Sequence, residues 1–300
     1  MEYDIRLKLS YEYETPVGGG RHQVRVVPRT IDGQQRVVAS SIDFTPRPAD
    51  RSDFGDFFGN SVTAIAYRDP HDALDVRMSA RISVHRPEPG IDLSPPPGKL
   101  KAEIQAVRSL AADSPHHFLA ASPFAPLDDA ITGFAGSVLA DAQSAEGAAE
   151  ALCQLIYDDF TYDGDATTVS TGAEEAFGLR RGVCQDFSHV MIAGLRGLGI
   201  PAGYVSGFLR TIPPPGKPRL EGADAMHAWV RVWCGRDAGW IEFDPTNGIR
   251  AGNDHITVAY GRDYGDVAPI VGMLKTSGGQ TIRHAVDVIP VGEQLRLRPW

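Results

Sequence analysis

The chain has 300 residues, 42% of them hydrophobic, and carries a formal net charge of −9 at pH 7. This length suffices for two domains, or for one elaborate domain with a sizeable hydrophobic core. Acidic and basic residues are interspersed, which argues against phosphate-backbone binding as the main task, so nucleic acid is not an expected partner.

Residues 1–90 are expected to form a small antiparallel β-domain with one buried face. Hydrophobic residues alternate from Tyr3 to Tyr13 and again from Leu74 to Val84, which is the period of a half-buried strand. Shorter apolar segments between them are separated by Gly- and Asp-rich turns. The N-terminus has no basic start followed by an apolar run, and no apolar stretch reaches membrane length, so the protein is expected to be cytoplasmic and not to bind membranes.

A proline-rich stretch marks the end of that domain. The five prolines between residues 87 and 97 form a stiff connector that neither a helix nor a central strand tolerates. Residues 91–150 are predicted to hold this connector and a mainly helical segment. Residues 151–300 are predicted to form the catalytic core, with strand-like alternation returning at 280–290.

The most informative motif surrounds Cys184, in the heptapeptide that runs from Arg181 to Phe187. Apolar residues recur at helical spacing from Phe187 to Leu198, and Pro201 then stops the helix. Cys184 is therefore expected at the first turn of a helix, where unpaired N–H groups and the helix dipole stabilise a thiolate. This position predicts a nucleophile.

The other two cysteines are predicted to be structural. Cys153 lies beside Leu152 and Ile156 on the apolar stripe of a helix, and Cys234 ends a strand at a Gly-containing turn. Three cysteines do not make a disulfide framework, and no Cys-x-x-Cys pair is present to hold structural zinc. No metal ion and no cofactor are therefore expected.

Two segments downstream of Cys184 alternate with a period of two, at 226–233 and 240–245. Residues 234–239 between them have turn composition, so an antiparallel hairpin is the simplest connection.

In one register of this hairpin His227 faces Asp244, and Arg231 faces Trp240. Directly opposite residues have Cβ atoms about 4.5–5.5 Å apart. The carboxylate would then accept a hydrogen bond from one imidazole nitrogen, while the other nitrogen faces the thiol of Cys184. These three residue types together predict a thiol acyl-transfer site.

Four motifs resemble those of the bacterial transglutaminase-like proteins, namely residues 182–189, 199–207, 227–230 and 243–247. That family shares the papain-like cysteine protease core of transglutaminases, with Cys, His and Asp in this chain order. The resemblance implies an α+β fold, in which an N-terminal antiparallel β-domain precedes a helix bearing Cys184 packed on an antiparallel sheet bearing His227 and Asp244. It also implies Cys184 as nucleophile, His227 as general base and acid, and Asp244 as the residue that orients the histidine.

The expected reaction is acyl transfer on a peptide or protein substrate. Hydrolysis is favoured, because water is always available and no motif specifies a lysine-binding acceptor site. An amine acceptor would instead make the protein a transglutaminase or ligase. Two further hypotheses are a non-catalytic peptide-binding module that keeps only the cleft, and an interaction protein whose working part is the β-domain of residues 1–90. No oligomeric state is predicted.

Overall fold

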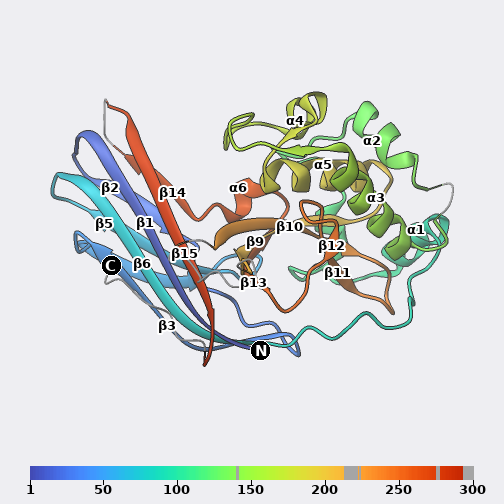
Figure 1. Cartoon of the computed structure of the whole chain (residues 1–300), viewed down its shortest axis with the longest axis horizontal. Helices are drawn as coiled ribbons and strands as arrows, with labels where there is room; N and C mark the ends of the chain where they lie inside the picture. Colours follow the sequence, from blue (N-terminus) through green and yellow to red (C-terminus); the bar gives the residue numbers. More distant parts are fainter. Residues whose placement is uncertain (140–141, 213–221, 223, 275–277, 293–300) are drawn as a thin grey trace.

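The computed structural model describes residues 1–139, 142–212, 222, 224–274 and 278–292. Two curved sheets occupy one side of the molecule, and a third sheet with its helices occupies the other (Figure 1). This arrangement of helices and antiparallel sheets confirms the predicted α+β fold class. Among helices of the described ranges, none combines the length and the apolar composition that a bilayer-spanning helix needs.

The first two sheets contain four antiparallel strands each. The first has the order β15 (Gln280–Pro290), β1 (Glu2–Val17), β6 (His71–Val84) and β3 (Gln35–Thr45). The second has the order β14 (Ile270–Leu274), β2 (Gly20–Val24), β5 (Ser61–Tyr67) and β4 (Asp50–Gly55). Strands β1 and β6 form as predicted, because their alternating side chains bury every second residue against one core.

Strands β14 and β15 do not belong to the sheet of the core, although the sequence places them in the range 151–300. Strand β15 pairs with β1 from Tyr3↔Pro290 to Tyr13↔Gln280, and β14 pairs with β2. The physical reason is that β1 and β2 would otherwise be bare sheet edges with unpaired backbone groups.

The third sheet and its helices make up the remainder of the described chain. The sheet has the order β12 (Ile249–Arg250), β11 (Trp240–Asp244), β10 (Ala225–Trp233), β9 (Ala202–Leu209) and β13 (His255–Gly261). A small parallel pair joins β7 (Thr161–Tyr162) to β8 (Arg181–Gly182). The helices are α1 (Pro97–Ala106), the 3₁₀ helix η1 (Pro115–Phe118), α2 (Asp129–Gly136), α3 (Ala145–Asp159), α4 (Ala173–Leu179), α5 (Cys184–Gly197) and α6 (Tyr264–Val267).

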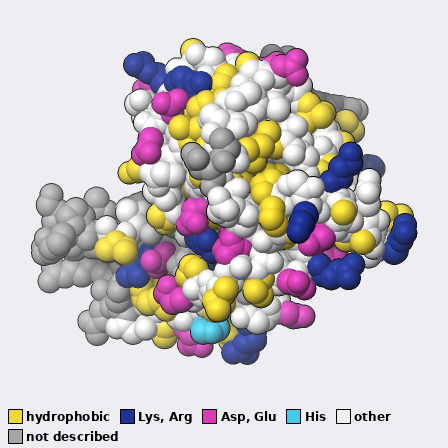
Figure 2. Space-filling model, turned by 90° about the vertical axis from the view of Figure 1, so that its right-hand side faces the viewer, with side chains coloured by type: hydrophobic (Ala, Val, Ile, Leu, Met, Phe, Trp, Pro, Cys, Tyr) yellow, Lys and Arg dark blue, Asp and Glu magenta, His cyan; other side chains and the backbone are white. Residues whose placement is uncertain are grey.

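Helix α5 is the central helix of this half, and residues 185–196 are all buried. It packs against β9 and β10 on one side and against α2, α3 and α4 on the other (Figure 1). Glycine is required where α2 crosses α5, because a Cβ at Gly194 would lie 2.8 Å from the Cβ of Ala135. On the outer face of this half, acidic and basic side chains are intermixed (Figure 2), which agrees with the interspersed charge of the sequence.

The β10–β11 hairpin forms, but the expected register is wrong by two residues. Arg231 lies opposite Glu242 and Trp233 opposite Trp240, whereas Arg231 was expected opposite Trp240. The turn is tighter than expected, since the N–H of Cys234 donates to the carbonyl of Gly239 at 2.8 Å. A shift of two residues keeps every side chain on its face of the sheet, so His227 and Asp244 still lie on the same face.

Two side-chain amides join the N-terminal sheets to β13, the edge strand of the third sheet. The amide of Gln35 donates to the Thr257 carbonyl at 2.7 Å and accepts from the Thr257 N–H at 2.9 Å. The amide of Asn60 makes the same two bonds with Tyr260, each 2.8 Å long. We call Gln35 and Asn60 the edge amides. They replace the missing neighbouring strand, so the buried backbone of β13 keeps its hydrogen bonds.

Candidate active site

Cys184 is the first residue of α5, as the sequence predicts, and its side chain is partly exposed. The carboxylate of Asp186 closes this helix start by accepting hydrogen bonds from the N–H of Val183 at 2.8 Å and the hydroxyl of Thr167 at 2.6 Å. Gly182 is needed beside it, because a Cβ there would lie 2.8 Å from Cγ of Asp186. The motif around Cys184 therefore specifies how the helix begins.

The other two cysteines are fully enclosed. Cys153 on α3 is 2% exposed, and burial raises its pKa to about 12. Cys234, directly after β10, has no exposed surface, and burial raises its pKa as well. Burial disfavours the charged thiolate at both positions, whereas Cys184 is accessible at a helix N-terminus.

His227 on β10 and Asp244 at the end of β11 lie in contact, as the sequence predicts. Nε2 of His227 is 2.8 Å from Oδ2 of Asp244, and both residues are buried. The backbone N–H of Thr246 donates to Oδ1 of Asp244 at 3.0 Å, and the side-chain amide of Asn247 donates to Oδ2 at 2.6 Å. The turn after β11 thus holds the carboxylate in place.

Cys184 also interacts with the imidazole of His227. Burial alone would lower the pKa of His227, but the charge and hydrogen bond of Cys184, together with those of Asp244, raise it to about 10. Burial alone would raise the pKa of Asp244, but the hydrogen bonds of His227 and His255 and the charge of His227 hold it well below its ordinary value. The structure therefore brings the three predicted residues together.

Trp229 and Glu242 support the imidazole from the same face of the sheet. The indole of Trp229 stacks on His227 with ring centroids 6.1 Å apart, and its N–H donates to Glu242 at 2.7 Å. Glu242 also accepts from the hydroxyl of Tyr260 at 2.7 Å and from the guanidinium of Arg86 at 2.8 Å. Burial works to raise the pKa of Glu242, but the charge of Arg86 and these hydrogen bonds lower it, so the carboxylate is ionised.

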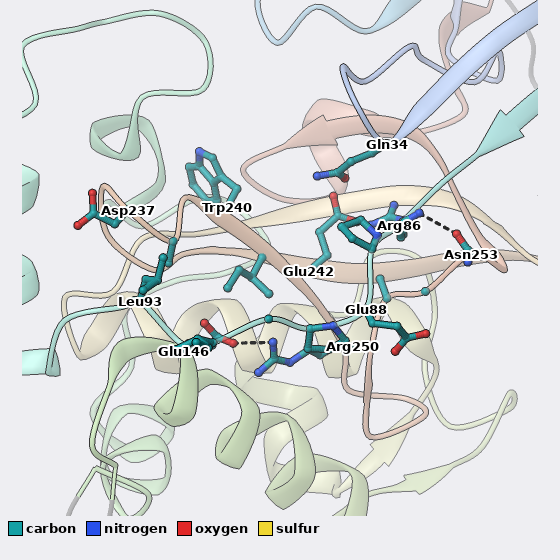
Figure 3. Close-up of a pocket in the computed structure, with 18 residues that line it drawn as sticks. Gln34, Arg86, Glu88, Leu93, Glu146, Asp237, Trp240, Glu242, Arg250 and Asn253 are labelled. Carbon is teal, nitrogen blue, oxygen red and sulfur yellow. Dashed lines mark hydrogen bonds and ion pairs between the residues drawn. The ribbon is translucent and has the colours of Figure 1, made fainter.

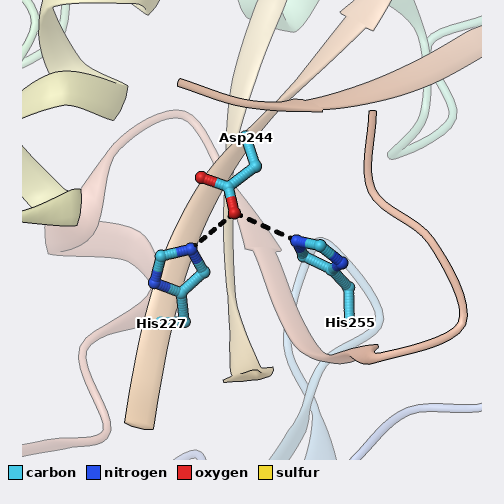
Figure 4. A group of neighbouring side chains, drawn as sticks. All are labelled: His227, Asp244 and His255. Atoms are coloured by element: carbon cyan, nitrogen blue, oxygen red, sulfur yellow. Dashed lines mark hydrogen bonds and ion pairs between the residues drawn. The ribbon is translucent and has the colours of Figure 1, made fainter. Parts of the chain in front are cut away.

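A second histidine, which the sequence analysis missed, lies on the opposite side of Asp244. Nε2 of His255, the first residue of β13, is 3.0 Å from Oδ2 of Asp244, so the carboxylate lies between two imidazoles (Figure 4). The available signal was a segment rich in β-branched and apolar residues from Ile256 to Tyr260, which predicts a buried strand. Only the strand order of the sheet places the start of that run beside β11.

His227, Asp244 and His255 could in principle hold a metal ion, since their ligand atoms lie within 4.8 Å of one another. The hydrogen bonds do not fit that use. The backbone N–H of Gly252 donates to Nδ1 of His255 at 3.1 Å, which places the ring proton on Nε2. Coordination through Nε2 would force that proton onto Nδ1, against the Gly252 N–H, so a hydrogen-bonded cluster fits this geometry better.

A cavity of about 520 Å³ is lined in part by Glu242, but Cys184, His227 and Asp244 are not among its lining residues. Figure 3 shows this lining. Its lining includes residues from Arg86 to Ile91 and Leu93, and also Trp240–Glu242 and Arg250–Asn253. Its charged groups are largely satisfied within the protein, for example by the ion pair between Arg250 and Glu146. The cavity therefore gives no reason to place the chemistry away from Cys184.

Comparison with known proteins now adds to this geometry. Residues 3–83 match the bacterial transglutaminase-like N-terminal region, and residues 132–245 match the transglutaminase-like superfamily. An uncharacterised protein of Mycobacterium tuberculosis is 35% identical over 96% of this chain and 92% of its own length. The chain belongs to the bacterial transglutaminase-like proteins.

This bacterial transglutaminase-like protein also has an uncharacterised relative in Mycobacterium leprae, 29% identical over 93% of this chain and 95% of the relative. A crystal structure of a candidate cysteine protease from Cytophaga hutchinsonii has a TM-score of 0.73 and is 20% identical, covering 100% of this chain and 94% of its own. That similarity shows a common fold. The family that the sequence motifs predicted is thereby confirmed.

Proposed function

We propose that this protein is a thiol-dependent acyl-transfer enzyme that hydrolyses peptide or amide bonds, with Cys184 as nucleophile, His227 as acid and base, and Asp244 as orienting residue. The observation that carries the proposal is the contact of His227 with the buried carboxylate of Asp244, together with the interaction of the same imidazole with the thiol of Cys184. A raised imidazole pKa favours an ion pair with a thiolate, which is the nucleophilic form of cysteine.

The first half-reaction forms a thioester. The sulfur of Cys184 adds to the carbonyl carbon of the substrate and gives a tetrahedral oxyanion. The C–N bond then breaks, and the imidazolium of His227 transfers its proton to the departing amine. The amine leaves, and the acyl group remains on the sulfur.

Stabilisation of the oxyanion is expected at the start of α5. The first N–H groups of a helix have no partner within the helix, and the dipole places partial positive charge there. The N–H of Cys184 is the donor that lies closest to the reacting bond, since it belongs to the nucleophile itself. One such donor is typically worth about 10²–10³ in rate.

The second half-reaction resolves the thioester. Neutral His227 takes a proton from a water molecule, the hydroxide equivalent adds to the thioester carbon, and the C–S bond breaks. The products are a carboxylic acid and the regenerated Cys184 with His227 protonated. An amine that replaces water would give a new amide instead. Adding a primary amine to the reaction therefore distinguishes the two acceptors.

The decisive experiment compares wild-type protein with Cys184→Ala on a library of peptides and isopeptides, with and without an added primary amine. If the reaction is hydrolysis, mass spectrometry should detect products with new free carboxyl groups, and their yield should be the same with and without the amine. Products that carry the added amine would show that the acceptor is an amine and that the protein is a transglutaminase or ligase. Binding of peptides without any turnover would indicate a peptide-binding module.

A matched control is Cys234→Ala, which removes a thiol that the site does not use. It should keep wild-type turnover, and Cys184→Ala should have none. Iodoacetamide applied to native protein near pH 7 should modify Cys184 and leave Cys153 and Cys234 intact. Equal labelling of all three cysteines, in protein shown to be folded, would contradict the proposal.

A further inference from the structure

Oδ2 of Asp244 accepts three N–H donors at once. They come from Asn247 at 2.6 Å, His227 at 2.8 Å and His255 at 3.0 Å. Asn247 belongs to the turn that follows Asp244, and His227 belongs to the paired strand β10. His255 arrives from β13, at the far edge of the sheet order, and has no part in the two half-reactions above.

The hydrogen bonds of His255 define its proton. Because Gly252 donates its backbone N–H to Nδ1, that nitrogen must present a lone pair. The proton of the neutral ring is therefore on Nε2 and is donated to Asp244. In this tautomer His255 is a fixed donor, whereas His227 is the ring that exchanges its proton with the thiol.

His255 is also held rigidly. Its side chain is 3% exposed, and its ring meets the indole of Trp229 edge-on with centroids 5.2 Å apart. Two residues further along β13, the edge amide of Gln35 holds both backbone groups of Thr257. The donor thus has little freedom to leave the carboxylate.

We propose that His255 is a positioning residue of the acyl-transfer site, which keeps the Asp244 carboxylate ionised and turned toward His227. This inference rests on the proposed function, in which Asp244 orients the catalytic imidazole of His227. His255 would in turn hold Asp244 in place. Two carboxylate donors on opposite sides stop Oδ2 from rotating away when His227 releases its proton to the substrate.

The sign of the expected pH effect follows from the groups around the carboxylate. His227 from β10, His255 from β13 and Cys153 from α3 face Asp244, and Cys184 acts on it through His227. His255 is one of the donors that hold the pKa of Asp244 low. Removing that donor frees the carboxylate to turn away from His227, which weakens its stabilisation of the imidazolium. Less of Cys184 is then held as thiolate at low pH, so the acid limb of its alkylation moves upward.

The experiment uses two variants of the full chain that differ by one methylene. His255→Gln places an amide N–H near the position of Nε2 and can still donate to Asp244. His255→Asn places its amide near Nδ1, where it can accept from Gly252 but does not reach the carboxylate. The rate of iodoacetamide alkylation of Cys184 is measured from pH 4 to pH 9 by mass spectrometry, and labelling of Cys153 and Cys234 reports any unfolding.

We expect His255→Gln to remain within about threefold of the wild-type rate at pH 7 and His255→Asn to lose roughly tenfold or more, because a hydrogen bond to a charged group is worth at least a factor of ten. The acid limb should shift upward in His255→Asn alone. Equal rates and equal acid limbs in both variants and wild type would overturn the role of His255. A wild-type Cys184 no more reactive than an ordinary thiol would instead overturn the proposed function itself.

Discussion

Replacement of the edge amide Asn60 by alanine should destabilise the protein far more than an ordinary Asn→Ala change. Asn60 has no exposed surface, and its side chain satisfies both the N–H and the C=O of Tyr260. Alanine leaves both backbone groups buried without partners, at a cost of about 1–3 kcal/mol each. The expected loss in the free energy of unfolding is therefore about 2–6 kcal/mol, measured by urea titration followed by circular dichroism.

Asn253→Ala is the matched control. Its side-chain oxygen accepts one hydrogen bond, from the N–H of Arg86 at 2.7 Å, and the residue is partly exposed, so water can replace it. The expected loss is only about 0.5–1.5 kcal/mol. If both variants lost the same free energy, or if Asn60→Ala stayed within about 0.5 kcal/mol of wild type, the edge amides would not hold β13 as described.

Three further outcomes concern the site. Asp244→Asn removes the negative charge that stabilises the imidazolium, so the pKa of His227 should fall and alkylation of Cys184 by iodoacetamide at pH 7 should slow roughly tenfold or more. Cys184→Ala should likewise lower the pKa of His227 from about 10, which an NMR titration of the histidine ring measures directly; an unchanged value would show that the thiol is not coupled to the ring. Gly182→Ala should push the Asp186 carboxylate away from the start of α5 and cost about 0.5–2 kcal/mol in thermal unfolding, and a stability equal to wild type would contradict the capping role.

The helix start at Cys184 could be predicted from sequence because its signals are local. Glycine, a capping aspartate and a helical apolar stripe lie within a few residues of one another, and the structure places Cys184 at the first helical position. The pairing of His227 with Asp244 was also predicted, although the hairpin register was wrong by two residues. Side-chain alternation determines the face of the sheet, whereas the register depends on the turn geometry.

The contacts of greatest sequence separation could not be predicted. His255 reaches Asp244 only because β13 pairs with β9 on the far side of the sheet, and no local pattern encodes that order. The edge amides act across 222 and 200 residues of sequence, through side chains that imitate a backbone strand. Glutamine and asparagine are ordinary surface residues in most sequences, so neither type carries a signal for this role.

The pairing of β15 with β1 has a consequence for how the polypeptide assembles during synthesis. Strand β1 leaves the ribosome long before its partner, since Tyr3–Tyr13 pair with Gln280–Pro290, and β2 likewise waits for β14. Until those late segments emerge, both early strands expose hydrogen-bonding edges that invite pairing with other nascent chains. A fragment of residues 1–90 would retain these open edges permanently, so self-association of that fragment would report its missing strands and not a native binding partner.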